Sequence, residues 1–263
     1  MDKRPIGVYD SGIGGLTVFS KLYKLLPNEN FIYFGDTANI PYGTKTKEEL
    51  LTITHKIMNY FKAQNVKAVV MACNTTSAVA YDTLKDDYDF VLYPVIQTVC
   101  KVIAEMNIKK IGTLSTEATA NSHAYKTNLQ KYNEDILVIE HGCPGKWVEI
   151  VENHSENEEE NRNILKENLD IILKENVEKI ILGCTHYPYL KDILTNFAGR
   201  DIFIDPSEYF SKYIVKNLEE NNLLNEKQEY KPKFYVSSNP DKFKKSSEIF
   251  YKMETLPTLV DKI

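Results

Sequence analysis

The sequence has little of several features that mark specialised classes of protein. Its four cysteines, Cys73, Cys100, Cys143 and Cys184, include no C-x-x-C pair, so neither a zinc ribbon nor a thioredoxin-type dithiol is indicated. No apolar run reaches the roughly 18 residues that cross a bilayer, and the N-terminal residues lack the apolar core of a secretory signal. We therefore expect a cytoplasmic protein with free thiols that does not bind a membrane.

Neither sign of charge dominates, because 32 Lys and Arg residues against 37 Asp and Glu residues give a net charge of −5. Nucleic-acid-binding proteins rely on strongly basic surfaces, so we expect no nucleic-acid partner. With 11 Gly and 10 Pro the chain is not of low complexity, and 43% of its residues are hydrophobic. A chain of 263 residues with this composition folds as one large domain or two smaller ones.

Short apolar runs alternate with longer amphipathic stretches, the pattern of βα units around a mostly parallel sheet. We expect strands at 6–9, 31–34, 68–72 and 233–237, and helices with apolar residues at helical spacing after each. The segments 46–49 and 155–158 read as capping boxes that begin two helices. A last helix is expected to run through Phe243 and Phe250.

Two segments recur in the same order along the chain. Residues 66–75 align with 177–186 and place Cys73 over Cys184, an offset of 111; residues 6–11 align with 111–116, an offset of 105. Two matches in register predict two similar α/β lobes, each with one cysteine at the carboxyl end of an equivalent strand. The chain beyond about residue 210 either rejoins the first lobe or forms an appendage.

Cys73 and Cys184 both follow buried-type strands, and short polar residues come after them. Ligands of open α/β sheets bind at such strand ends. A thiol at a helix N-terminus has a lowered pKa, so we expect two reactive thiols here. The alternative is that both are small apolar residues that end buried strands. Cys100 is expected in a helix core, and Cys143 in a loop with a structural role.

The segment 10–15 (D-S-G-I-G-G) is similar to a phosphate loop, but Thr17 replaces the third glycine and no Walker lysine follows. It favours a loop whose backbone N–H groups approach a small anion, with Asp10 and Ser11 facing the ligand; a tight turn without a ligand is the other reading. Cys184 and His186 have poor zinc spacing. For His186 we expect a hydrogen-bonding, proton-handling or structural role.

Four motifs occur in order over about the first 190 residues: D-S-G-x-G-G-L at 10–16, G-D at 35–36 with P-Y-G at 41–43, A-C-N-T at 72–75, and G-C-T-H-Y-P at 183–188. Together they resemble the signature motifs of the glutamate racemases, in the aspartate/glutamate racemase superfamily. The resemblance implies a cofactor-independent isomerase that interconverts L- and D-glutamate and supplies D-glutamate for peptidoglycan, hence for cell wall and cell shape.

The resemblance also implies an architecture and an assembly. It implies an α/β fold of two pseudo-symmetric, doubly wound domains with mostly parallel sheets and the active site between them. The C-terminal segment returns to the first lobe, which divides the chain into 1–97 plus 210–263 and 98–209. Members of the family commonly form homodimers, and we expect one here, with glutamate as the small-molecule partner.

By resemblance, Cys73 and Cys184 are the two catalytic acid/base groups, one on each face of Cα. It implies that the substrate is bound by Asp10, Ser11, Tyr42, Gly43, Asn74, Thr75, Thr185 and His186. Four further residues are expected to support the site: Asp36, Thr116, Thr119 and Glu152. The segment after Cys143 is one residue longer than is usual in the family, which is why Glu152 is taken as the supporting glutamate. No metal and no other cofactor is implied.

Two alternatives remain. An aspartate racemase of the same superfamily also uses paired cysteines, although the forms of the motifs at 10–15 and 184–188 favour glutamate. A catalytically silent two-lobe amino-acid-binding protein belongs to another class, and it requires that both cysteines at repeated positions are ordinary core residues.

Overall fold

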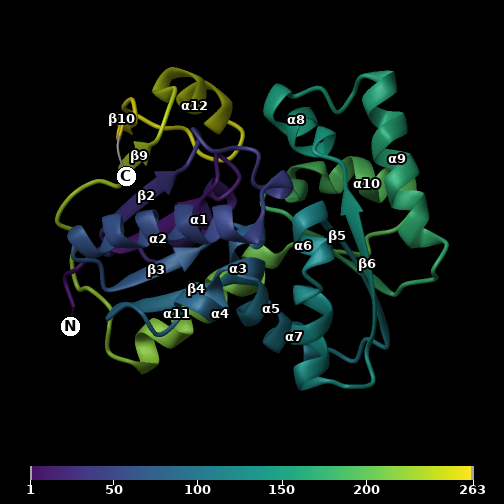
Figure 1. The fold of residues 1–263 in the computed structure, drawn as a ribbon, viewed down its shortest axis with the longest axis horizontal. Helices are drawn as coiled ribbons and strands as arrows, with labels where there is room; N and C mark the ends of the chain where they lie inside the picture. Colours follow the sequence, from purple (N-terminus) through teal and green to yellow (C-terminus); the bar gives the residue numbers. More distant parts are fainter. Residues whose placement is uncertain (1, 262–263) are drawn as a thin grey trace.

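The computed structural model describes residues 2–261 and contains two parallel sheets that lie side by side (Figure 1). The first sheet has the order β10-β9-β2-β1-β3-β4 and consists of β1 (Ile6–Asp10), β2 (Phe31–Gly35), β3 (Ala68–Met71), β4 (Val91–Pro94), β9 (Lys233–Val236) and β10 (Thr258–Leu259). The second has the order β6-β5-β7-β8 and consists of β5 (Lys110–Thr116), β6 (Leu137–Cys143), β7 (Lys179–Gly183) and β8 (Phe203–Ile204). All strand pairings within residues 2–261 are parallel, which confirms the expected α/β class.

Helices connect the strands, as parallel pairing requires. In the first half of the chain they are α1 (Leu16–Leu25), α2 (Lys47–Ala63), α3 (Asn74–Val79), α4 (Tyr81–Leu84), α5 (Val95–Ala104), α6 (Glu117–Asn121) and α7 (Ala124–Tyr132). In the second half they are α8 (Lys146–Asn153), α9 (Glu159–Leu173), α10 (Lys191–Ala198), α11 (Pro206–Glu220) and α12 (Pro240–Ser247). Two short 3-10 helices, η1 (Tyr42–Thr44) and η2 (Tyr187–Leu190), lie in loops.

The sequence repeat corresponds to a repeat of topology. The order β2-β1-β3-β4 in the first sheet recurs as β6-β5-β7-β8 in the second, so that β1 matches β5 and β3 matches β7. These are the strands that the aligned segments predict. Cys73 follows β3 and Cys184 follows β7, and the two cysteines therefore occupy equivalent places in the two lobes.

Both faces of the first sheet are covered, because alternate residues of its strands point to opposite faces. Val8 belongs to an apolar cluster with Phe19 of α1 and Phe210 of α11. Its neighbour Tyr9 belongs to another cluster with Phe61 of α2. The near-continuous apolar strands of the sequence follow from this two-sided burial.

The cluster that contains Val8 continues into the second lobe. Ile111 of β5, Ile181 of β7 and Tyr125 of α7 are fully buried members of it. The other face of the second sheet packs separately, with Leu182 of β7 against Trp147 of α8 and the buried residues of α9. One apolar core is thus common to both lobes. We call it the shared core.

The C-terminal segment rejoins the first sheet. β9 pairs with β2, and β10 pairs with β9; Figure 1 shows this yellow segment beside β2. Before it, α11 packs against α1 and α5. The chain therefore passes between the lobes twice, through the neighbouring helices α5 and α11.

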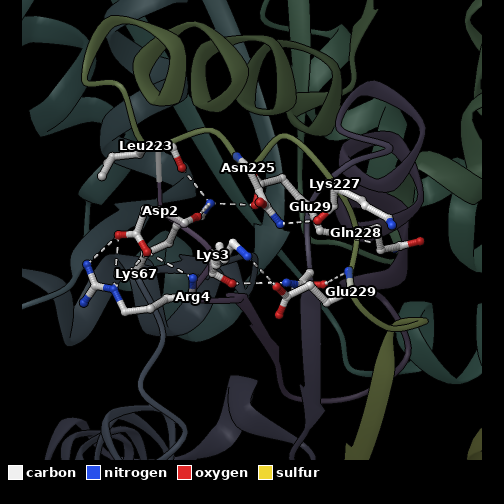
Figure 2. Close-up of polar contacts among 11 residues, drawn as sticks. Asp2, Lys3, Arg4, Glu29, Lys67, Leu223, Asn225, Lys227, Gln228 and Glu229 are labelled. Atoms are coloured by element: carbon white, nitrogen blue, oxygen red, sulfur yellow. Dashed lines mark hydrogen bonds and ion pairs between the residues drawn. The ribbon is translucent and has the colours of Figure 1, made fainter.

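A buried ion pair holds this returning segment in place. Lys67 and Glu29, each at most 1% exposed, lie just before β3 and β2, with Lys67 Nζ 2.6 Å from Glu29 Oε2. Lys67 Nζ also donates to the carbonyls of Asp2 and Leu223, and Glu29 Oε1 accepts from the backbone N–H of Asn225 (Figure 2). All three ammonium hydrogens are thereby used, and the N-terminus, two strands and the returning chain meet at one point.

Some local predictions are confirmed and others are wrong. Thr46 and Glu49 form the expected capping box at the start of α2. Ser155 and Glu158 do not form the second one, and α9 begins only at Glu159. The side-chain amide of Asn161 donates to both Ser155 Oγ and Glu158 Oε2, so these two side chains bond Asn161 and not the backbone at a helix start. The last helix, α12, ends at Ser247, short of Phe250. Across residues 2–261, no helix is long and apolar enough to span a bilayer.

We expect Lys67→Met to lower the free energy of unfolding by about 3–5 kcal/mol, because it leaves the buried Glu29 carboxylate without a positive charge beside it. The matched control is Lys3→Met, since Lys3 pairs with Glu229 at 3.1 Å with side chains 69% and 48% exposed. That variant should lose no more than about 1 kcal/mol. Urea denaturation measures both, and equal losses would contradict the role given to the buried pair.

Candidate active site

A cavity of about 210 Å³ lies between the lobes, at the carboxyl ends of the strands. Ser11, Cys73 and Cys184 line it from the loops after β1, β3 and β7, and Thr116 and Cys143 from the last positions of β5 and β6. Both sheets therefore direct the same ends of their strands toward one cavity, as expected for ligand sites in parallel α/β proteins.

Most residues predicted for the site line this cavity. They are Ser11, Tyr42, Gly43, Cys73, Asn74, Thr75, Thr116, Glu152, Cys184, Thr185 and His186. The other three, Asp10, Asp36 and Thr119, are buried and do not line it. Each of the three instead makes hydrogen bonds to a residue that does.

Cys73 is the N-cap residue of α3 and is 5% exposed. The prediction of a lowered pKa is wrong for it. Burial, with the negative charge of Asp10 nearby, raises the pKa of Cys73 to about 12, although bonds from the Thr76 backbone and hydroxyl act in the opposite direction. Loss of water around the sulfur outweighs the favourable helix terminus.

Cys184 has a different environment, although it occupies the equivalent position. A turn and η2 follow it, so it does not begin an α-helix. Its sulfur lies 3.8 Å from His186 Nδ1, and His186 Nε2 lies 3.4 Å from Glu152 Oε1, an ion-pair distance that is long for a hydrogen bond. The three side chains form a row from the cavity to α8.

The charges along this row determine the protonation of His186. Burial alone lowers the pKa of the imidazole, but its contacts with Cys184 and Glu152 outweigh burial and raise the pKa of His186 to about 10. Burial raises the pKa of the Glu152 carboxyl, yet the contact with His186 lowers it below its usual value. At neutral pH an imidazolium therefore stands between the Cys184 sulfur and a carboxylate.

Asp10 connects the two lobes behind the cavity. It is fully buried, and its carboxylate accepts from the backbone N–H of Gly12 and from the hydroxyl of Thr185. Burial raises the pKa of Asp10, although the charge of His186 and these hydrogen bonds oppose the rise. A side chain on Gly14 would overlap Thr185 and His186, so the glycine lets the lobes approach closely.

Asp36 supports the loop that carries Tyr42 and Gly43. The Tyr42 hydroxyl donates to Asp36 Oδ2, and the Ser237 hydroxyl, from the returning segment, donates to Asp36 Oδ1. The Tyr9 hydroxyl in turn donates to that of Tyr42 at 2.9 Å. The wall of the cavity at Tyr42 is thus fixed by a buried network.

Three threonine hydroxyls meet where the lobes touch. Thr75 Oγ1 lies 3.1 Å from Thr116 Oγ1 and 3.3 Å from Thr119 Oγ1, and the last two are 2.9 Å apart. Thr75 belongs to α3, whereas Thr116 ends β5 and is the N-cap of α6, the helix that contains Thr119. Since each hydroxyl both donates and accepts, the cluster offers hydrogen bonds to an anion at the cavity wall.

Among the residues at or next to the cavity that the sequence did not assign to the site are Cys143 and Tyr125. Cys143 is the last residue of β6 rather than a loop residue, and it lines the cavity; the partly exposed strand before it, which includes His141, lacks the apolar run that marks the other strands. Tyr125 of α7 donates a hydrogen bond to Asn74 Oδ1 at 2.7 Å. No sequence motif connects Tyr125 with Asn74, so only the fold brings this pair together.

In the part of the chain that the structure describes, residues 2–261, no group of three or more His, Cys, Asp or Glu side chains is placed to hold a metal ion. The absence of a metal or another cofactor stays a prediction.

Comparison with known proteins gives a consistent result. The family described as Asp/Glu/Hydantoin racemase matches residues 14–208. A glutamate racemase from Trichodesmium erythraeum is 38% identical over 242 residues, which are 92% of this chain and 89% of that protein. A glutamate racemase from Francisella tularensis, solved in complex with D-glutamate, is 36% identical with a TM-score of 0.90 over 100% of this chain and 98% of the other. An aspartate racemase from Picrophilus torridus shares only the fold, at 17% identity and a TM-score of 0.59 over 82% of this chain and 94% of the other.

The chain belongs to the Asp/Glu/Hydantoin racemase family and, within it, to the glutamate racemases. The resemblance seen in the four sequence motifs is thereby confirmed, as is the expected fold.

We expect Glu152→Gln to lower the pKa of His186 from about 10 toward its ordinary value, because the carboxylate beside the imidazole is lost. The folded-state pKa of His186 is the higher one, so its contribution to stability is fully present below pH 6.5, the ordinary value, while Glu152 is ionised, and it falls as the pH rises through about 10. Titration of ¹³C-labelled histidines by NMR measures the shift.

Glu149→Gln is the matched control for this titration. Glu149 also lies on α8 and lines the cavity, but its side chain is 63% exposed and pairs with Lys146. The titration of His186 should be unchanged in this variant. A similar shift in both variants would mean that general electrostatics, and not the contact with Glu152, controls the imidazole.

Proposed function

We propose that this protein interconverts L- and D-glutamate without a cofactor, by two-base proton transfer between Cys73 and Cys184. The observation that carries the proposal is that two thiols, at the ends of equivalent strands, open on one cavity. Inversion of a carbon centre by proton transfer needs one group on each face of Cα. One thiolate removes the proton while the opposite thiol delivers another, and the roles exchange in the reverse reaction.

The surroundings of the two thiols support one resting state. A protonated His186 lies 3.8 Å from the Cys184 sulfur. Cys73, buried beside Asp10 with a pKa of about 12, is a thiol at neutral pH. In this state Cys184 is the base and Cys73 the acid. By family resemblance, Cys184 takes the proton from L-glutamate. The reaction of D-glutamate requires the opposite state, in which Cys73 is the base and Cys184 the acid.

The polar groups of the cavity suit an amino acid with two carboxylates. We assign substrate binding to Asp10, Ser11, Tyr42, Gly43, Asn74, Thr75, Thr185 and His186. Asp36, Thr116, Thr119 and Glu152 support them. Hydroxyls and backbone N–H groups near the α-carboxylate stabilise the charge that develops when Cα loses its proton.

The wider role follows from the reaction. We infer that the D-glutamate supports peptidoglycan synthesis, that the protein acts in the cytoplasm, and that it is a homodimer. We also propose the domain division 1–97 plus 210–263 and 98–209, whose boundaries fall within α5 and α11. An aspartate racemase is the alternative activity, and a two-lobe amino-acid-binding protein the alternative without catalysis.

Incubation with L- or D-glutamate in D₂O, without pyridoxal phosphate, should give racemisation with deuterium at Cα, because each thiol exchanges its proton with solvent between turnovers. Circular dichroism follows the racemisation and mass spectrometry the deuterium. Aspartate in parallel should exchange far more slowly. Faster exchange of aspartate would support the alternative activity, and no exchange of either amino acid would exclude both racemases.

Cys73→Ala and Cys184→Ala should each lower the rate of racemisation at least about 10²-fold, since each removes one of the two acid/base groups. Cys100→Ala is the control. Cys100 is also a fully buried cysteine, but it lies in α5 and does not line the cavity. Its variant should racemise glutamate at nearly the parent rate, and a parent-like rate for either of the other two would contradict the two-base assignment.

A further inference from the structure

Tyr125 of the second lobe makes a buried hydrogen bond to Asn74, a residue of the candidate site in the first lobe. It lies on α7 and is fully buried, and its hydroxyl donates to Asn74 Oδ1 at 2.7 Å. Asn74 is the residue after Cys73, is 4% exposed and lines the cavity. The hydrogen bond therefore runs from α7 of the second lobe to Asn74 of the first lobe, the residue next to Cys73.

The ring of Tyr125 also contacts the chain next to the other thiol. A Cβ placed on Gly183, the residue before Cys184, would lie 2.9 Å from Tyr125 Cε2. Gly183 thus gives the ring its space against the end of β7. Tyr125 therefore touches the segments that carry both thiols.

The direction of the hydrogen bond decides which end of the Asn74 amide faces the cavity. An asparagine side chain has one acceptor atom and one NH₂ donor, and its orientation follows from its partners. The amide atom that faces the Tyr125 hydroxyl is Oδ1, which can only accept, so the hydroxyl is the donor. Burial raises the pKa of the Tyr125 phenol well above its usual value, which keeps that proton in place. With Oδ1 engaged, the Nδ2 group is the end of Asn74 that is left for a ligand.

We propose that Tyr125 is a positioning residue that fixes the Asn74 amide so that Nδ2 donates to the α-carboxylate of the substrate. This role rests on the proposed function. Cys73 must lie at Cα, and the side chain next to it reaches the groups that Cα carries. An N–H donor can pair with the carboxylate and not with the ammonium, whereas a rotated amide would set Oδ1 against the carboxylate oxygens.

The test is Tyr125→Phe, which removes the hydroxyl and keeps the ring against Gly183. We expect kcat/KM for both enantiomers of glutamate to fall about tenfold to a hundredfold, the scale of a misplaced substrate-binding group. The matched control is Tyr93→Phe. The Tyr93 hydroxyl donates to Asn217 Oδ1, also at 2.7 Å, and neither residue lines the cavity. That variant should stay within about twofold of the parent, since it loses a bond of the same kind outside the site.

A double-mutant cycle separates positioning from a general structural effect. If Tyr125 acts through Asn74, the loss of its hydroxyl should cost little activity in an Asn74→Ala background. An equal loss in both backgrounds, or a Tyr125→Phe variant with parental activity, would overturn the positioning role while the proposed function stands. A parent protein that does not racemise glutamate overturns the proposed function and this role together.

Discussion

The shared core, the apolar cluster that runs through both sheets, determines where everything else in this protein lies. β1 and β3 pack through α1, α5 and α11 against the inner face of β5 and β7. Because packed interiors are dense and poorly compressible, this contact fixes the separation of the strand ends. Two loops that are 111 residues apart in sequence thereby face each other across one cavity.

Three polar contacts between the lobes gather at the edge of this core that faces the cavity. Thr185 reaches Asp10, Thr75 meets Thr116, and Tyr125 reaches Asn74. Apolar burial holds the lobes together without directional preference, whereas hydrogen bonds have strict geometry. The shared core therefore sets the distance between the lobes, and the hydrogen bonds at its edge set their relative position at the site.

The backbone symmetry of the lobes does not extend to their charges. Cys73 lies near a buried carboxylate, Asp10, and its pKa is raised to about 12. Cys184 lies near an imidazolium, because contacts with Cys184 and Glu152 raise the pKa of His186 to about 10. A chemical step that takes a proton on one side and gives one on the other needs unlike protonation states at any moment. Two lobes of similar topology, whose cysteines have unlike neighbours, meet that need.

The sequence was sufficient for the parts of the fold that depend on local pattern. The strand ends, the capping box at Thr46 and the repeat around Cys73 and Cys184 can all be read from spacing and polarity. Contacts between distant residues could not be predicted in this way. Asn161 displaces a second capping box, and desolvation reverses the expected pKa shift of Cys73. Tyr125 meets Asn74 only after the lobes close.

The returning C-terminal segment shows why the two-lobe description alone is incomplete. Lys67 and Glu29 anchor its start through Leu223 and Asn225. Farther along, Ser237 donates to the Asp36 carboxylate that also accepts from Tyr42. Since Tyr42 and Gly43 form a wall of the cavity, the position of that wall depends on residues near the end of the chain. The segment is therefore part of the machinery of the site, although it contributes none of the proposed catalytic groups.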